Sequence, residues 1–213
     1  MDNPFWPLYQ LRLRTRELEL RLPNEAELVA LCRVARAGIH DPETMPFGVA
    51  WTDQPSPQFE REFMKFHWGI RGRWSPQSWT LELAVFHDGQ PIGCQGINAT
   101  DFAVLQEVHT GSWLGQAYQG RGLGKQMRAA VLELAFTGLG AVSATSGAFL
   151  DNPASVAVSR ALGYQNNGIG RMAPRGEPRE HLNLRITRQD WQARRYCEVE
   201  IVGLAGCRDM FGL

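Results

Sequence analysis

Residues 111–125, which read GSWLGQAYQGRGLGK, decide the fold predicted for this chain. They follow a run of alternating polar and apolar residues typical of a strand, and they lead into a helical pattern of apolar residues. Gly120, Gly122 and Gly124 remove side chains where a ligand could approach the backbone. The start of a helix also leaves N–H groups unpaired, and these suit a phosphate. The stretch therefore predicts a phosphate-binding turn between a strand and a helix.

Three phosphate-binding patterns can be compared with this turn. A Walker loop requires Gly-x-x-x-x-Gly-Lys-Ser/Thr, but Gln119 stands where the first glycine belongs and Gln126 follows Lys125. The dinucleotide fingerprint GxGxxG also fails, because the glycines here recur at every second position. The third pattern, Gln/Arg-x-x-Gly-x-Gly/Ala, fits residues 119–124, which read QGRGLG. On this motif alone, a glycine-rich turn without a ligand stays open.

A second informative segment lies downstream at residues 146–164, which read SGAFLDNPASVAVSRALGY. Asn152 followed by Pro153 predicts a helix start, because Asn caps free N–H groups and Pro is tolerated at the first helical position. Leu162 ends this helix, and Gly163 supplies the left-handed residue that often follows a helix.

Taken together, these segments resemble the GCN5-related N-acetyltransferases (GNAT). The run QGRGLG is similar to the coenzyme A pyrophosphate loop of that family, and the segment from Asn152 to Tyr164 is similar to its later helix ending in Leu-Gly-Phe/Tyr. Trp113-Leu114 resembles the Gly-x-Trp-Leu of a branch that includes ribosomal-protein N-terminal acetyltransferases. Residues 11–47, ending in GIHDPETMPF, resemble an actinobacterial subgroup of this branch that includes a succinyl-CoA-dependent member.

The resemblance implies an α/β (α+β) fold: a mixed, mostly antiparallel sheet flanked by helices, with splayed fourth and fifth strands at residues 104–114 and 141–146. One GNAT domain is expected over residues 1–213, with a C-terminal extension from about residue 187. The pantetheine arm is expected in the gap between the splayed strands. The residues implied for coenzyme A binding are Trp113, Leu114, Gln119, Gly120, Arg121, Gly122, Leu123, Gly124, Lys125, Asn152 and Ser155.

The implied reaction moves an acetyl or succinyl group from coenzyme A to a primary amine, and this needs a proton acceptor. His109 is the candidate base, because it stands two residues before Gly111, where many relatives carry Glu, and because imidazole titrates near neutrality. A histidine that merely packs on a sheet face is the alternative. The other candidate bases are Asp101, Glu107, Glu177 and Glu180, or solvent.

The leaving thiolate also needs a partner. Ser155 matches a position where this branch carries Ser, and we expect it to relay a proton or to hydrogen-bond the sulfur. A residue that only supports the helix start is the equal alternative. Tyr164 falls in the helix stop and is expected in the core.

The remaining pattern predicts the other elements. Asn24 and Glu27 form a capping box before a helix that ends at Gly38, and Asp88-Gly89 predicts a hairpin. Residues 39–57 are expected to form a loop, and its aromatic part from His40 to Trp51, with Phe66, His67 and Trp68, is our candidate for the acceptor-side wall. The alternative is that these aromatic side chains only anchor a long loop. The expected strands are residues 12–22, 80–87, 90–98, 181–186 and 198–202.

Composition limits the class of partner. Lys and Arg total 22, as do Asp and Glu, so the chain has no net charge to attract nucleic acid or a membrane surface. The four cysteines lack CxxC spacing, so free thiols and no metal are expected. The sequence shows no signal peptide, so we expect a cytoplasmic enzyme. Its expected acceptor is a small-molecule or peptide amine, and a homodimer is a possible assembly. The alternative is a non-catalytic acyl-CoA sensor of the same fold.

Overall fold

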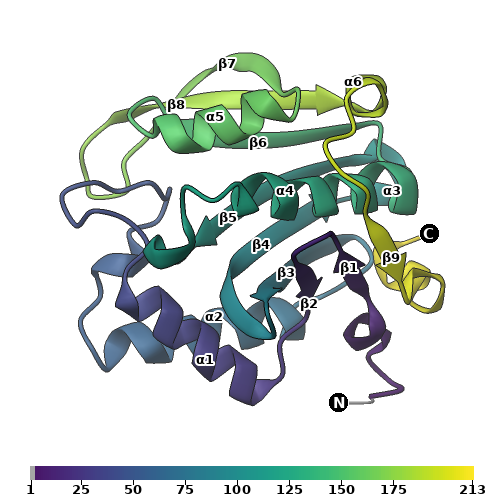
Figure 1. Ribbon diagram of the computed structural model, residues 1–213, viewed down its shortest axis with the longest axis horizontal. Helices are drawn as coiled ribbons and strands as arrows, with labels where there is room; N and C mark the ends of the chain where they lie inside the picture. The colour runs from purple at the N-terminus through teal and green to yellow at the C-terminus, as the bar shows by residue number, and fades with distance from the viewer. Residues whose placement is uncertain (1–2) are drawn as a thin grey trace.

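A single sheet with nine strands runs through residues 3–213, which are the residues that the computed structural model describes (Figure 1). The strand order is β7-β8-β6-β5-β4-β3-β2-β1-β9. Neighbouring strands are antiparallel except for β5 and β6, which are parallel. The strands are β1 Arg12–Arg14, β2 Glu19–Arg21, β3 Ser78–His87, β4 Gln90–Thr100, β5 Glu107–Leu114, β6 Ser143–Phe149, β7 Gln165–Met172, β8 Arg179–Thr187 and β9 Glu200–Val202.

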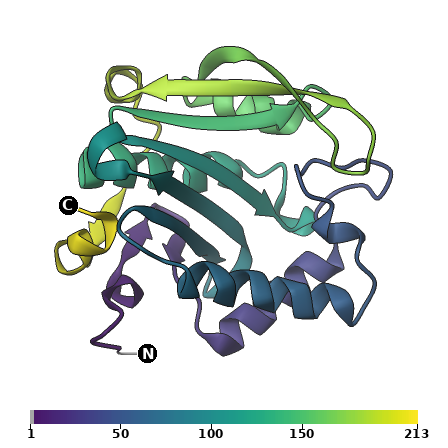
Figure 2. The ribbon, with the colours of Figure 1, turned by 180° about the vertical axis from the view of Figure 1, so that it is seen from behind.

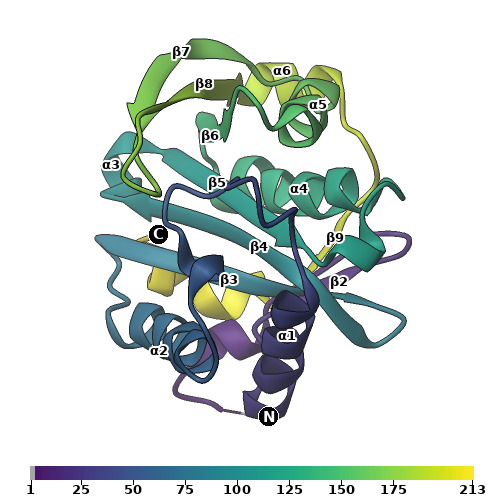
Figure 3. The same cartoon turned by 90° about the vertical axis from the view of Figure 1, so that its left-hand side faces the viewer.

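Helices cover both faces of this sheet, as the side view shows (Figure 3). The α-helices are α1 Glu25–Ala37, α2 Gln58–Gly72, α3 Phe102–Leu105, α4 Leu123–Glu133, α5 Pro153–Ala161 and α6 Arg188–Ala193. A π-helical turn, η4 Leu134–Leu139, continues α4, and the 3-10 turns are η1 Pro7–Gln10, η2 Trp51–Asp53, η3 Gln116–Tyr118 and η5 Leu204–Phe211.

Two apolar layers hold the helices in place. On one face, α4 packs Met127 and Val131 against Ile97 and Val108 of the sheet. On the other face, α1 and α2 pack against side chains that alternate with these along the same strands, such as Cys94. Strand alternation thus gives each face its own core, and the predicted mostly antiparallel sheet flanked by helices is confirmed.

Three of the predicted strands are wrong in their bounds. Residues 12–22 form a hairpin, β1 and β2, because Thr15 and Leu18 close a turn in which the Thr15 N–H donates to the Leu18 carbonyl at 2.9 Å. The strand expected from residue 104 begins at Glu107, because the short helix α3 comes first. Asp101 and Gln106 flank that helix, and both have a φ of 50°, which interrupts extended backbone. The fifth strand of the predicted set, placed at 141–146, is β6 and runs on to Phe149.

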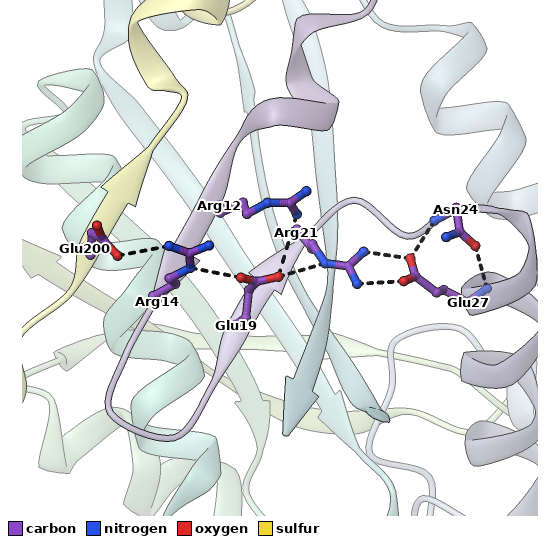
Figure 4. Close-up of polar contacts among 7 residues, drawn as sticks. All are labelled: Arg12, Arg14, Glu19, Arg21, Asn24, Glu27 and Glu200. Carbon is purple, nitrogen blue, oxygen red and sulfur yellow. Dashed lines mark hydrogen bonds and ion pairs between the residues drawn. The ribbon is translucent and has the colours of Figure 1, made fainter. Parts of the chain in front are cut away.

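A chain of ion pairs ties this hairpin to its neighbours (Figure 4). Glu19 contacts Arg14 and Arg21, and Arg21 makes a two-point contact with Glu27 at 2.7 and 2.6 Å. Glu27 is also the acidic member of the predicted capping box, which is confirmed: its side chain accepts from Asn24 N–H at 2.9 Å. The Arg21 guanidinium holds the pKa of Glu27 below its ordinary value. The network therefore fixes where α1 begins.

The C-terminal residues complete the sheet and the core. β9 pairs with β1, with Leu13 opposite Ile201. The Trp191 indole of α6 donates to the buried Glu133 at 2.8 Å, and Phe211 packs edge-on against Trp79. The extension expected from about residue 187 is therefore packed into the sheet and core rather than appended to them.

Candidate active site

The two parallel strands separate after a short pairing. β5 and β6 pair only over Glu107–His109 and Ser143–Thr145. Beyond this point side chains bridge the strands: Thr110 Oγ1 donates to the Thr145 carbonyl at 3.1 Å, and Ser146 Oγ donates to the Thr110 carbonyl at 2.9 Å. Residues 111–114 of β5 then have no strand partner on that side. Their backbone groups face a gap, as the splay implied by the sequence resemblance requires.

The glycine-rich turn lies where β5 leads into α4. Gly120 and Gly122 have φ values of 74° and 82°, which favour glycine, and no atom lies within 4 Å of the Cβ position at either residue. No side chain caps α4, so its first N–H groups stay available. Gln119 turns its amide inward instead of toward the turn, donating to the carbonyls of Leu114 at 2.8 Å and Ile39 at 2.7 Å. The turn therefore leaves its backbone N–H groups free of side-chain contacts.

Three cations near the turn occupy different environments. Arg121 is exposed, and Lys125 is held over the Tyr196 ring at 5.6 Å. Arg128 points away from the turn toward the strand gap, where it donates to Ser146 Oγ and Ser112 Oγ, both at 2.9 Å. Arg128 is 4% exposed, and no carboxylate among residues 3–213 forms an ion pair with it. The gap therefore holds a buried positive charge that the protein itself does not neutralise.

The second predicted segment lies beside the same gap. Asn152 caps α5 by accepting from Ser155 N–H at 3.2 Å, as the sequence predicts. The Ser155 side chain is half-buried and lies in the first turn of α5. Tyr164 is buried and shares a hydrogen bond of 2.9 Å with Thr110, which confirms its place in the core.

His109 is the last residue of β5 that pairs with β6. Its Nδ1 is 3.1 Å from Thr145 Oγ1 on β6. Surrounding protein atoms lower the pKa of His109, and the nearby charges of Arg128 and His181 lower it further, although the residue keeps an exposed edge. The imidazole is therefore neutral at pH 7 and able to accept a proton.

A pocket with a volume of about 690 Å³ opens on the face covered by α2. Its walls are mainly aromatic and include Phe47, Trp51, Phe59, Phe63, Phe66 and Trp113. The pocket thus gathers several of the aromatic residues predicted for the acceptor side, whereas His40 and Trp68 do not line it: His40 bonds to Thr52 Oγ1 at 2.8 Å, and the Trp68 indole donates to Glu25 at 3.2 Å. Gly111, Ser112 and Trp113 form the side of the pocket that belongs to β5.

The titratable side chains of the pocket come from α2 and β3, and the sequence pattern did not indicate any of them as a base. Glu62, His67 and Glu82 all line it, and His109 does not. Glu82 alternates with Leu81 and Leu83, so the strand pattern alone indicates an ordinary outward-facing carboxylate. The feature that distinguishes Glu82 lies on the neighbouring strand: it pairs with Gly96, and the missing side chain of this glycine leaves space for the Glu82 carboxylate.

The other expected bases lie apart from this pocket. Asp101 precedes α3, and Glu107 accepts a hydrogen bond from Ser143 at 2.5 Å beside Arg185. Glu177 and Glu180 are exposed near the turn between β7 and β8. Within residues 3–213 no group of three or more His, Cys, Asp and Glu side chains could hold a metal ion. No helix in that part of the chain is long and apolar enough to cross a bilayer.

Comparison with known families decides the assignment. Residues 17–165 match the family model described as an acetyltransferase (GNAT) domain. The chain belongs to the GNAT acetyltransferase family. For a GNAT protein, the open glycine turn and the separated strands fit a coenzyme A thioester, because one offers free N–H donors to phosphates and the other offers unpaired backbone to an amide-containing arm.

Solved structures with the same GNAT fold extend over most of the chain. Mycobacterium smegmatis RimJ in complex with CoA-disulfide is 18% identical with a TM-score of 0.71, covering 94% of each chain. A GCN5-related N-acetyltransferase from Brucella melitensis is 19% identical with a TM-score of 0.67, covering 86% of this chain and 81% of its own. RimL, a ribosomal L7/L12 alpha-N-protein acetyltransferase in complex with coenzyme A, is 17% identical with a TM-score of 0.65, covering 81% and 95%. At these identities the likeness concerns the fold.

Proposed function

We propose that this GNAT protein transfers an acetyl or succinyl group from coenzyme A directly to a primary amine. One observation carries the proposal: β5 is a shared wall. Its residues 111–113 line the aromatic pocket on one face, while the free edge of the same strand opens onto the gap that leads to the glycine turn. An acyl donor held in the gap and an acceptor held in the pocket would meet at this strand, which is the arrangement that direct transfer needs.

Coenzyme A binding is assigned to the residues that the fold brings to this gap. The N–H groups of residues 120–124 and the cations Arg121 and Lys125 would hold the pyrophosphate. Trp113 and Leu114 would offer backbone to the pantetheine arm, and Asn152 and Ser155 lie at the start of α5. Gln119 contributes by holding the turn to the end of β5, and Leu123 is buried under the turn.

The chemistry needs donors for the developing oxyanion, a proton for the leaving sulfur and a base for the amine. Unpaired N–H groups near Leu114 are suited to the oxyanion, and the Ser155 hydroxyl is suited to the sulfur. Two side chains on the pocket side of the sheet could accept the amine proton: His109 from β5 and Glu82 from β3.

The buried charge of Arg128 bears on the acyl group. A guanidinium without a carboxylate partner in a separated part of the sheet favours an anionic neighbour. A succinyl group ends in a carboxylate and an acetyl group does not, so Arg128 supports succinyl-CoA as a donor beside acetyl-CoA.

The test is release of free coenzyme A thiol from acetyl-CoA and succinyl-CoA, with and without a panel of primary amines and short peptides. An N-acyltransferase releases thiol in an amine-dependent manner and forms an amide detectable by mass spectrometry. Binding of both thioesters in calorimetry, without amide formation from any acceptor, would instead identify the acyl-CoA sensor.

A further inference from the structure

The carboxyl group of Glu82 lies at the pocket in surroundings with few polar partners. Within the described residues, its side chain accepts one hydrogen bond, from Cys94 Sγ to Oε2 at 3.1 Å. Thiols are weak donors, so this contact compensates little of what the carboxylate loses by leaving water. The position is therefore costly for stability, and a costly charged group that lines a pocket needs an explanation in function.

Two glycines leave no side chain between Glu82 and the edge of β5, where the acyl transfer is proposed to occur. Glu82 on β3 pairs with Gly96 on β4, and Gly96 pairs with Gly111 on β5, so the three residues form one row across the sheet. A methyl group on Gly96 would overlap Glu82 Oε1, so the carboxylate occupies the space that this glycine leaves. At Gly111 no atom lies within 4 Å of the Cβ position. The row ends at the open edge of β5.

The charge and shape of the other pocket residues favour one kind of acceptor. Of the described residues that line it, two are glutamates and none is lysine or arginine. Aromatic rings such as Trp51, Phe63 and Trp113 form its walls, and aromatic faces attract both apolar groups and cations. A cation with an apolar body fits these walls, whereas a carboxylate beside the amine would face Glu82, which has no ion pair among the described residues; Glu62 is already paired with Lys65 at 2.8 Å.

We propose, on the basis of the proposed acyl transfer, that this pocket binds a small primary amine with an aromatic or alkyl body, and that Glu82 binds its ammonium group and accepts the proton. The amine nitrogen then attacks the thioester carbonyl carbon, forming the C–N bond. The C–S bond breaks, and its electron pair leaves on sulfur. One ammonium proton goes to Glu82 and then to solvent, a second goes to the sulfur, and the products are an amide and free coenzyme A.

Burial supports this role, because it raises the pKa of Glu82 to about 7, with the Cys94 contact opposing the rise. The titratable groups facing Glu82 are Cys94 from β4 and Glu62 and His67 from α2. Burial, together with the nearby charge of Arg71, lowers the pKa of His67 to about 4, so His67 is neutral at working pH. The ion pair needs ionised Glu82 and a charged amine. The kcat/KM should thus rise through about pH 7 and fall only near the amine pKa, about 10 for an alkylamine.

The experiment uses 2-phenylethylamine and hexylamine as acceptors, phenylalanine as the carboxylate-bearing counterpart and the dipeptide Ala-Phe-amide as a peptide acceptor. The variants are Glu82→Gln, Glu62→Gln as the matched pocket control and His109→Ala as the rival base. We expect both amines to be acylated at least tenfold better than phenylalanine or the peptide, as measured by kcat/KM. Glu82→Gln should lower kcat/KM by about 10²–10⁴-fold and remove the limb near pH 7. It should leave the Kd for acetyl-CoA unchanged, and Glu62→Gln should cost less than about tenfold.

Three outcomes would overturn the inference while leaving acyl transfer intact. The first is a wild-type rate and pH profile for Glu82→Gln. The second is a loss of the pH limb in His109→Ala alone, which would assign the base to His109. The third is a preference for Ala-Phe-amide, which would assign the pocket to peptide ends. If none of the acceptors yields an amide in the wild-type protein, the proposed function itself fails.

Discussion

Arg175 in the turn between β7 and β8 makes a two-point ion pair with Asp53, with Nε to Oδ2 and Nη2 to Oδ1 both at 2.7 Å. Arg179 on the same hairpin donates to the Met45 carbonyl at 2.6 Å. These contacts fasten the loop between α1 and α2 to the far side of the gap, where the two segments lie close together (Figure 2). The loop that carries Phe47 and Trp51 into the pocket is thus held to the β7–β8 hairpin.

Arg175→Ala should loosen that loop. Because the ion pair is exposed, we expect a modest effect: a roughly two- to fivefold rise in the acceptor KM. Amide exchange in residues 47–53 should become faster while the melting temperature stays nearly constant. Arg171→Ala, an exposed arginine on β7 of the same hairpin, is the control. Equal exchange rates in both variants would show that the ion pair does not restrain the loop.

The glycine turn can be tested by a pair of substitutions. Gly122→Val should weaken coenzyme A binding by about 10–100-fold, because a branched side chain opposes the φ of 82° and fills the space before the free N–H groups. Gly124→Ala is the matched control, since its Cβ would lie 3.7 Å from Val158, at ordinary contact distance. Calorimetry gives both affinities, and Arg121→Glu serves as a second variant if Gly122→Val does not fold. Unchanged affinity in folded Gly122→Val would exclude the turn from the site.

Substitutions of Ser155 and Asn152 should affect different quantities, the rate of thiol release and the free energy of unfolding. Ser155→Ala should slow thiol release roughly tenfold if the hydroxyl assists the leaving sulfur, with little change in melting temperature. Asn152→Ala removes the cap of α5 and should lower the free energy of unfolding by about 1 kcal/mol. Single-turnover rates and urea unfolding distinguish the two. A wild-type rate in Ser155→Ala would leave Ser155 with a purely local role at the start of α5.

The stability of the protein should depend on pH through Glu82. Burial raises the pKa of Glu82 from an ordinary 4.5 to about 7, so the folded state holds this proton more tightly than the unfolded chain. Its contribution to stability is fully present below pH 4.5 and is lost as pH rises through about 7. The free energy of unfolding of Glu82→Gln, relative to wild type, should therefore increase by roughly 1–3 kcal/mol between pH 4.5 and pH 8.

His67 acts in the opposite direction, since burial lowers its pKa from 6.5 to about 4. Its contribution is present above pH 6.5 and is lost as pH falls toward 4. The two pH ranges overlap and the two effects have opposite signs: His67→Gln should remove a rise in stability between about pH 4 and 6.5, whereas Glu82→Gln should remove a fall in stability between pH 4.5 and about 7. Urea unfolding at pH 4.5, 5.5, 7 and 8 measures both, and parallel profiles for Glu82→Gln and wild type would contradict the burial argument.

The sequence predicted those elements that depend on residues only a few positions apart. The capping box at Asn24, the stop at Gly163 and the open turn around Gly122 each depend on residues within a few positions, and each is present. The hairpin at residues 12–22 was missed although its leucines change from odd positions at Leu11 and Leu13 to even positions from Leu18 onward, and this break in the alternation marks the turn. The strand β7 was missed because it is polar and almost wholly exposed, so its pairing with β8 leaves no hydrophobic period.

The candidate site was predictable on the phosphate side and not on the acceptor side. A phosphate turn uses backbone groups that glycines reveal in sequence. The proposed acceptor pocket is instead lined by Glu82 and Gly111, and Gly96 lies between them in one row of the sheet, an alignment that strand register sets. Register brings together residues whose spacing in the chain carries no pattern. The sequence therefore predicted His109, which stands two residues before Gly111, and did not indicate Glu82.

The pairing of β1 with β9 has a consequence for how the chain is made. β1 emerges early from the ribosome, but its outer partner is only complete with Val202, and Phe211 follows later still. Until then one edge of the growing sheet offers unpaired backbone groups to any other strand in reach. Synthesis at about 5–20 residues per second leaves that edge open for several seconds. A nascent chain stopped short of β9 should therefore be more prone to pair with other strands, and the short strand β9 covers the β1 edge once it is made.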